Sequence, residues 1–170
     1  MRVAVLVEEK YQVLEVWYPY YRLREEGVET VMLGTGRFSS YPSKEGYPAP
    51  EELSIKKADA NYFDGVVIPG GWAPDFLRRH RQINEFVKKM HKQEKLVASI
   101  CHGGWVLVSA NILNGKKATC FSAIKDDVIN AGAEYLDDEV IVDGNIITSR
   151  RPDDLPAFCR EMIKFLKRSG

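Results

Sequence analysis

The sequence has no excess of charge of either sign, because 24 Lys and Arg residues are balanced by 24 Asp and Glu residues. Proteins that bind nucleic acid usually carry a basic excess, so we expect no nucleic-acid partner. No segment reaches the roughly 18 consecutive apolar residues of a membrane helix, and we expect no membrane partner. The first residues lack the long apolar region and the cleavage site of a signal peptide, which predicts a cytoplasmic protein.

Cysteine is also scarce. Its three copies are an odd number at wide spacing, which argues against a disulfide framework. There is no C-x-x-C pair, and the three histidines show no metal-ligand spacing, so we expect neither a metal site nor a cofactor. Hydrophobic residues make up 45% of the sequence, which excludes disorder as the main state. A chain of this length can bury its own core, and we expect one domain over residues 1–170.

Short apolar runs recur along the chain, and such runs are typical of strands buried on both faces of a parallel sheet. We expect strands at residues 3–7, 28–33, 65–68, 96–100 and near 118–121. Helices are expected at residues 13–26, around 83–90, at 105–110, at 124–131 and from 155 onward. Residues 34–50 predict a loop or irregular hairpin, and residues 143–145 predict a hairpin turn. This alternation predicts an α/β domain with a mostly parallel sheet, in which ligands bind beyond the carboxyl ends of the strands.

Cys101 lies where one of these strands meets the next helix, which is the layout of a nucleophile elbow with cysteine in place of serine. The small neighbours Ser99 and Gly103 let the sharp turn close. The N–H groups of the helix N-terminus favour the thiolate, the reactive form of cysteine. A buried, inert cysteine is the alternative, which we prefer for Cys120, expected inside a strand, and for Cys159, expected beside the apolar stripe of the last helix.

Further candidate residues lie close to this elbow in the chain or in the expected sheet. Gly70 and Gly71 follow another strand, and their N–H groups can hold an oxyanion together with the amide of His102, although an ordinary turn has the same composition. The His102 ring would activate the thiol if it reaches the sulfur. Because adjacent side chains seldom meet, it can instead cap the helix or contact a partner chain.

Glu15 lies near the start of the first expected helix, within an apolar stretch. Near the thiolate, a buried carboxyl would have a raised pKa and could donate a hydrogen bond to sulfur when protonated. Taken alone, its position favours an exposed carboxylate in the first helical turn. Trp72 and Trp105 flank the glycine turn and the elbow, where they can line a pocket, fill an interface or pack in the core.

Together these motifs resemble the PfpI intracellular protease family, which is related to the parkinsonism-associated deglycase and to class I glutamine amidotransferase domains. The resemblance spans nearly the whole chain and keeps the order of the motifs. Its motifs are Glu15 with Pro19, residues 69–75, residues 98–103, residues 124–127 with 130–132, residues 142–144 with 148–150, and residues 153–156. It implies a flavodoxin-like three-layer sandwich with a mostly parallel central sheet and a nucleophile elbow.

The resemblance also implies roles for individual residues. Glu15 approaches Cys101, which reverses the exposed position favoured above, and Gly71 and His102 supply the oxyanion donors. His102 is paired with an acidic residue of a neighbouring subunit, at the position that is Asp75 here and Glu in some relatives. The resemblance further implies self-association into dimers that assemble into hexamers.

Three functions are compatible with these residues. In the first, which we prefer, a Cys101 thiolate adds to small reactive carbonyls or glycated proteins as a hemithioacetal, and Glu15 or His102 moves the proton. This is the chemistry of a glutathione-independent glyoxalase or a protein deglycase. The second is an intracellular cysteine peptidase that uses Cys101, His102 and Asp75 across subunits. The third is a non-enzymatic redox or stress sensor in which Cys101 oxidises to a sulfinic acid.

Overall fold

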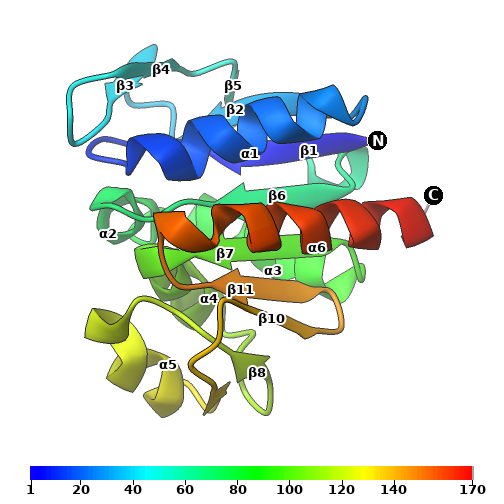
Figure 1. Ribbon diagram of the computed structural model, residues 1–170. Coiled ribbons are helices and arrows are strands. Elements are labelled where there is room, and N and C mark those ends of the chain that lie inside the picture. The colour runs from blue at the N-terminus through cyan, green and yellow to red at the C-terminus, as the bar shows by residue number, and fades with distance from the viewer. Residues whose placement is uncertain (170) are drawn as a thin grey trace.

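A seven-stranded sheet runs through the centre of the computed structural model, which describes residues 1–169 (Figure 1). All neighbouring strands of this sheet are parallel except those of the β10–β11 hairpin. In spatial order the strands are β10 (Val140–Asp143), β11 (Ile146–Ser149), β7 (Leu96–Ile100), β6 (Gly65–Ile68), β1 (Arg2–Leu6), β2 (Glu29–Gly34) and β5 (Leu53–Ser54). The mostly parallel sheet predicted from the apolar runs is confirmed.

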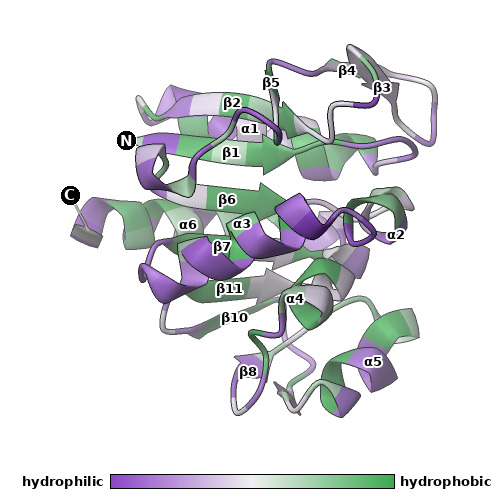
Figure 2. Ribbon diagram, turned by 180° about the vertical axis from the view of Figure 1, so that it is seen from behind, coloured by the Kyte–Doolittle hydropathy of each residue, from purple (hydrophilic) through white to green (hydrophobic). Residues whose placement is uncertain are grey.

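Helices cover both faces of the sheet. Figure 1 shows α1 (Val13–Glu25) and α6 (Leu155–Ser169) on one face, and Figure 2 shows α3 (Arg81–Lys92) and α4 (Gly104–Ala110) on the other. The outer face of α3 is hydrophilic in Figure 2, while its four regularly spaced apolar side chains are buried. The predicted three-layer sandwich is therefore confirmed. No helix within residues 1–169 combines the length and apolar character needed to cross a bilayer.

The strand order explains where a site can form. The five neighbouring parallel strands β2-β1-β6-β7-β11 follow the 2-1-3-4-5 order of flavodoxin-like sheets. The order reverses between β1 and β6, so the chain leaves these two strands in opposite directions and opens a crevice beyond their carboxyl ends. The segments that follow β1, β6 and β7 carry Glu15, Gly70 and Cys101, and the topology brings them to this one edge.

Several smaller elements surround the sheet. The region predicted as a loop or irregular hairpin contains an antiparallel hairpin of β3 (Ser40–Pro42) and β4 (Pro48–Pro50). A separate parallel pair consists of β8 (Lys117–Ala118) and β9 (Glu134–Tyr135). The remaining elements are α2 (Ala73–Leu77), α5 (Lys125–Asn130) and the 3₁₀ turns η1 (Ala60–Tyr62), η2 (Cys101–Gly103), η3 (Ser122–Ile124) and η4 (Pro152–Asp154).

The prediction of a strand through Cys120 is wrong. Strand β8 ends at Ala118, and the backbone after it takes other partners: the N–H of Thr119 donates to Thr148 Oγ1 at 2.9 Å, and that of Phe121 donates to the carbonyl of Cys101 at 3.3 Å. Because these bonds draw the segment toward the elbow, it cannot continue a sheet ladder. Cys120 is buried all the same, and so is Cys159.

The β10–β11 hairpin is held to the sheet through Asn145 in its turn. The Asn145 amide nitrogen donates to the carbonyls of Lys95 at 2.6 Å and His91 at 3.2 Å, and its Oδ1 lies 2.9 Å from His91 Nδ1. The side chain is almost completely buried. Since a buried polar group that loses its partner costs free energy, this contact stabilises the edge of the sheet.

We expect Asn145→Ala to lower the free energy of unfolding by about 1–3 kcal/mol, because it leaves the Lys95 carbonyl without its donor. Urea denaturation measures this change. Asn130→Ala is the matched control, since Asn130 is exposed at the end of α5, and it should change stability by less than about 0.5 kcal/mol. Equal effects of the two substitutions would contradict the anchoring role of Asn145.

Candidate active site

The backbone turns sharply at Cys101, between β7 and α4. Cys101 has a φ of +61°, in the left-handed region that residues with a side chain seldom adopt. The turn packs tightly, because a Cβ on Gly103 would lie 2.6 Å from the Ile68 carbonyl oxygen and 2.8 Å from Ser99 Oγ. The predicted nucleophile-elbow geometry is confirmed, and it holds the sulfur at the carboxyl edge of the sheet with 7% of the residue exposed.

Glu15 lies against this sulfur. The residue is completely buried, its Oε2 accepts a 2.6 Å hydrogen bond from the Gly70 N–H, and the thiol of Cys101 lies close enough to its carboxyl to affect its pKa. A Cβ on Gly70 would lie 2.6 Å from Oε2 and 2.9 Å from Sγ, so glycine is required between them. The exposed position favoured by the first helical turn is wrong, and the approach to Cys101 implied by the family resemblance is confirmed.

Glu15 reaches this position because the first turn of α1 is fixed. Gln12 caps the helix, and its side-chain oxygen accepts hydrogen bonds from the N–H groups of Leu14 at 2.6 Å and Glu15 at 3.2 Å. The Gln12 N–H donates in turn to the Gly70 carbonyl at 3.3 Å. These bonds dock the start of α1 on the turn after β6, so the Glu15 carboxyl is directed inward.

Glu15 and Cys101 compete for a proton. Burial raises the pKa of Glu15 from 4.5 to about 7, more than the Gly70 and Cys101 hydrogen bonds lower it. Burial and the nearby Glu15 charge raise the pKa of Cys101 as well. The helix-terminus effect expected to favour a thiolate is therefore outweighed. Because either ion raises the pKa of the other group, the pair loses one proton near neutral pH and keeps the second.

Two backbone donors face the sulfur. The N–H groups of Gly71 and His102 hydrogen-bond to Cys101, and both lower the pKa of its thiol. They come from the turn after β6 and from the elbow, where the sequence pattern predicted oxyanion donors. The Gly70 N–H, predicted for the same role, donates to the Glu15 carboxylate instead. An oxygen on an atom bonded to sulfur would lie near the same donors, which stabilise negative charge there.

The His102 ring also reaches the sulfur, with Nδ1 at 3.3 Å from Cys101 Sγ. The expectation that adjacent side chains do not meet fails here, because the left-handed turn at Cys101 bends the chain back. The ring is fixed by stacking on Phe121, with centroids 5.0 Å apart, and by an edge contact with Trp105 at 5.3 Å. Burial and the positive charge of Lys44 lower the pKa of His102, so the imidazole is neutral at pH 7.

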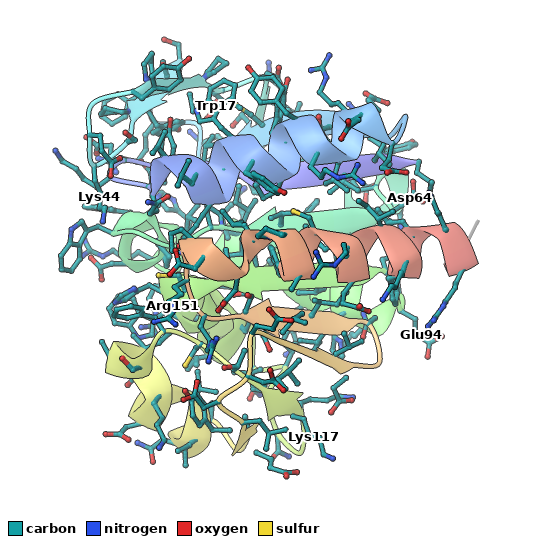
Figure 3. The ribbon with its side chains drawn as sticks, in the orientation of Figure 1. Trp17, Lys44, Asp64, Glu94, Lys117 and Arg151 are labelled. Atoms are coloured by element: carbon teal, nitrogen blue, oxygen red, sulfur yellow. The ribbon has the colours of Figure 1, made fainter. Side chains whose placement is uncertain are left out.

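A cavity of about 230 Å³ opens over these groups. The residues that line it come from six segments of the chain: Gln12, Glu15, Lys44, Gly71, Trp72, Cys101, His102, Phe121 and Pro152. Figure 3 shows Lys44 at the carboxyl end of the sheet, away from Asp64 and Glu94 at the other end. Within residues 1–169, no three or more His, Cys, Asp or Glu side chains are grouped so that they could hold a metal ion.

The DJ-1/PfpI family model matches residues 1–165. The chain belongs to the DJ-1/PfpI family. A deglycase of Pyrococcus abyssi is 43% identical over 167 residues, which cover 98% of this chain and 100% of the relative. The "Putative cysteine protease YraA" of Bacillus subtilis is 40% identical over 166 residues, or 98% of each chain.

A solved structure supports the same assignment. It is a two-domain protein from Anabaena variabilis with DJ-1/ThiJ/PfpI-like and ferritin-like domains, and it superimposes with a TM-score of 0.95 at 42% identity. The match covers 98% of this chain and 48% of that one, so this DJ-1/PfpI chain spans about half of the two-domain protein.

Not every residue predicted for this DJ-1/PfpI site lies in the cavity. Asp75 is partly buried on α2, where it is ion-paired with Arg79, and within residues 1–169 no hydrogen bond or ion pair joins it to His102 of its own chain. Pairing with His102 of a second copy stays a prediction. Trp72 lines the cavity with 57% of the residue exposed, whereas Trp105 packs behind His102 and bonds Asp127 through its indole N–H at 2.8 Å.

The sequence analysis missed four residues that line the cavity: Gln12, Lys44, Phe121 and Pro152. Gln12 could have been predicted, because it follows the first strand closely and ligands bind beyond the carboxyl ends of strands in such sheets. The other three come from loops whose position depends on contacts far apart in the sequence. No local pattern marks Lys44, which lies in the β3–β4 turn.

We expect Glu15→Gln to change how stability depends on pH. The Glu15 carboxyl has its pKa raised from 4.5 to about 7 in the folded chain, so its contribution to stability is complete below pH 4.5 and is lost as pH rises through 7. The wild-type free energy of unfolding should fall by about 3 kcal/mol over this interval relative to that of Glu15→Gln.

Urea denaturation at several pH values between 4 and 8 measures this difference. Glu94→Gln is the control, because Glu94 is an exposed carboxyl at the far end of the sheet, and this variant should follow the wild-type curve (Figure 3). Parallel curves for wild type and Glu15→Gln would show that the carboxyl titrates normally, contrary to the effect of its burial.

Proposed function

We propose that this DJ-1/PfpI protein is a cysteine-dependent enzyme that acts on reactive carbonyls, as a glutathione-independent glyoxalase or a protein deglycase. The observation that carries the proposal is the buried pair of Glu15 and Cys101, which shares a proton beside two backbone N–H donors. Addition of a thiol to an aldehyde needs a proton acceptor for sulfur and a stabilised oxygen. The name of the Pyrococcus abyssi relative, a deglycase, supports the same class of substrate.

The first step is addition of Cys101 to the aldehyde carbon of methylglyoxal. Sulfur forms the S–C bond while the Glu15 carboxylate takes the thiol proton. The 2.6 Å hydrogen bond from the Gly70 N–H holds the carboxylate in place for this transfer. The electrons of the C=O bond move to oxygen, where the N–H groups of Gly71 and His102 stabilise the charge. Protonation of that oxygen gives a hemithioacetal.

The second step moves a proton between the two substrate carbons. Glu15 or neutral His102 removes the proton from the carbon bonded to sulfur, and the resulting enediol receives a proton on the neighbouring carbon. The product is a lactoyl thioester on Cys101. Attack by water breaks the C–S bond, releases lactate and restores the thiol, so methylglyoxal and one water give one lactic acid.

The size of the cavity favours a small substrate. Pockets for drug-sized molecules have volumes of about 300–1,000 Å³, whereas this cavity has about 230 Å³. A three-carbon dicarbonyl or a single modified side chain fits that volume better than an extended peptide. The exposed Trp72 at the rim gives an apolar contact for whatever carries the carbonyl.

We expect Cys101→Ala to abolish lactate formation from methylglyoxal without glutathione, because it removes the atom that bonds to substrate. Cys159→Ala is the control, since Cys159 is buried in α6 and does not line the cavity, and it should retain at least about half of the wild-type kcat/KM. Enzymatic quantification of lactate measures both rates.

If folded wild-type protein formed no lactate and released no carbonyl from glycated peptides, the proposal would be wrong. Accumulation of a sulfinic acid on Cys101 under peroxide, seen by mass spectrometry, would then favour a redox or stress sensor.

A second candidate function is that of a cysteine peptidase. The contact of 3.3 Å between Cys101 Sγ and His102 Nδ1 favours it, because a peptidase needs a base at the thiol and a donor for the leaving amine. The lowered pKa of His102 within one chain disfavours an imidazolium. An acidic side chain on the ring would reverse that effect, and Asp75 from a second copy in a dimer or hexamer is our candidate.

If the peptidase uses Asp75 across subunits, Asp75→Asn and Cys101→Ala should each lack hydrolysis of a fluorogenic peptide. Co-refolding equal amounts of the two variants should restore about a quarter of the wild-type activity, because mixed pairs contain one intact site. Sedimentation analysis checks that the variants self-associate. Full peptidase activity in Asp75→Asn alone would exclude this arrangement.

A further inference from the structure

Lys44 is the one cationic side chain among the residues that line the cavity, since the pKa of His102 is lowered, and the proposed chemistry does not use it. It lies in the turn between β3 and β4, 29 positions after Glu15 in the sequence. Its charge acts on both groups beside the sulfur, lowering the pKa of Glu15 and that of His102. The ammonium group therefore acts on the interior of the site.

The position of Lys44 is fixed by the backbone around it. The Lys44 N–H donates to the Tyr11 carbonyl at 2.9 Å, and the Lys10 N–H donates to the Pro42 carbonyl at 2.8 Å. The buried Tyr11 hydroxyl donates to the Tyr47 carbonyl at 2.8 Å on the far side of the turn. These bonds dock the β3–β4 hairpin on the loop between β1 and α1, next to the Gln12 cap.

The backbone of Lys44 is hydrogen-bonded, but its ammonium group has no ion-pair partner in the described part of the chain. Within residues 1–169, no carboxylate lies within 4.0 Å of its ammonium group, although many other charged side chains of the chain are paired. Lys44 is an exposed cation on an anchored turn at the mouth of a small cavity, and its ammonium group has no ion-pair partner among the described residues, so it is suited to bind an anion from solution.

The cavity also has more room than methylglyoxal requires. At roughly 30 Å³ for each water molecule in the liquid, about 230 Å³ corresponds to about eight water-sized groups. Methylglyoxal has five non-hydrogen atoms. An oxoaldehyde with one more methylene and a carboxylate has nine, close to that number, so the cavity has room for a carboxylate of this size.

We propose that Lys44 recognises a carboxylate on the carbonyl substrate, so that anionic α-oxoaldehydes are preferred over neutral ones. The substrate class rests on the function proposed above, whereas the recognition of an anion at Lys44 does not. The aldehyde carbon bonds to Cys101, and the carboxylate at the other end of the same molecule meets the ammonium group. With 4,5-dioxopentanoate, uptake of one water then gives 2-hydroxypentanedioate by the proton transfer already described.

The first experiment tests recognition of an anion without turnover. Iodoacetate and iodoacetamide have similar shapes, but only iodoacetate carries a carboxylate, and both alkylate sulfur with loss of iodide. The rate ratio of iodoacetate to iodoacetamide at Cys101, followed by peptide mass spectrometry, should fall about tenfold or more in Lys44→Gln. Lys44→Arg should retain most of the ratio. Lys57→Gln removes an exposed lysine outside the cavity and should match the wild type.

The second experiment compares turnover of 4,5-dioxopentanoate and methylglyoxal. The wild type should prefer the anionic substrate in kcat/KM by about tenfold or more, and Lys44→Gln should lose that preference mainly through a higher KM. Raised salt should reduce the preference, because it screens exposed charges.

The outcomes separate this inference from the proposed function. An alkylation ratio that does not depend on Lys44 overturns the inference, even if both oxoaldehydes are turned over. Equal losses of kcat for both substrates in Lys44→Gln also overturn it, because the lysine would then act on the Glu15–Cys101 pair. A Lys44-dependent ratio without turnover of either oxoaldehyde supports anion recognition and contradicts the proposed function.

Discussion

The hydrogen bond from the Gly70 N–H to the buried Glu15 carboxylate is the contact on which the rest of the site depends. It joins the turn after β6 to the first turn of α1, across the point where the strand order reverses. One carboxylate oxygen is held by this bond, while the other has no hydrogen-bond partner within residues 1–169. A carboxyl that is shielded from water in this way keeps its proton to unusually high pH. The protonation of a sulfur beside it then depends on whether the carboxyl is charged.

The parts of this structure that follow from local sequence were predictable. Continuous apolar runs predicted the exact first and last residues of β6 and β7, because strands buried on both faces lack the polar alternation that makes strand ends hard to assign. The elbow at Cys101 was predictable because strand, small residues and helix follow one another directly. The depth of Glu15 was not predictable from its own segment, since a first-turn glutamate is equally suited to solvent, and only the resemblance to a family indicated it.

The parts that depend on distant contacts were not predictable. Cys120 was assigned to a strand because its neighbours are apolar, but hydrogen bonds from its segment to Cys101 and Thr148 decide its conformation. Lys44 gave no signal, because the docking of its hairpin involves Tyr11 and Pro42, which are remote in sequence from the elbow. Within a shared family fold, such loops are the natural place for differences between relatives, since they line the cavity without forming the central sheet.

The left-handed backbone of Cys101 has an evolutionary consequence. Such a conformation costs about 1–3 kcal/mol for a residue with a side chain, out of the roughly 5–15 kcal/mol by which a domain is stable. Glycine would adopt the same φ without that cost. Selection for stability alone would therefore replace this cysteine, and a lineage that had lost the use of the sulfur would be free to drift toward glycine there.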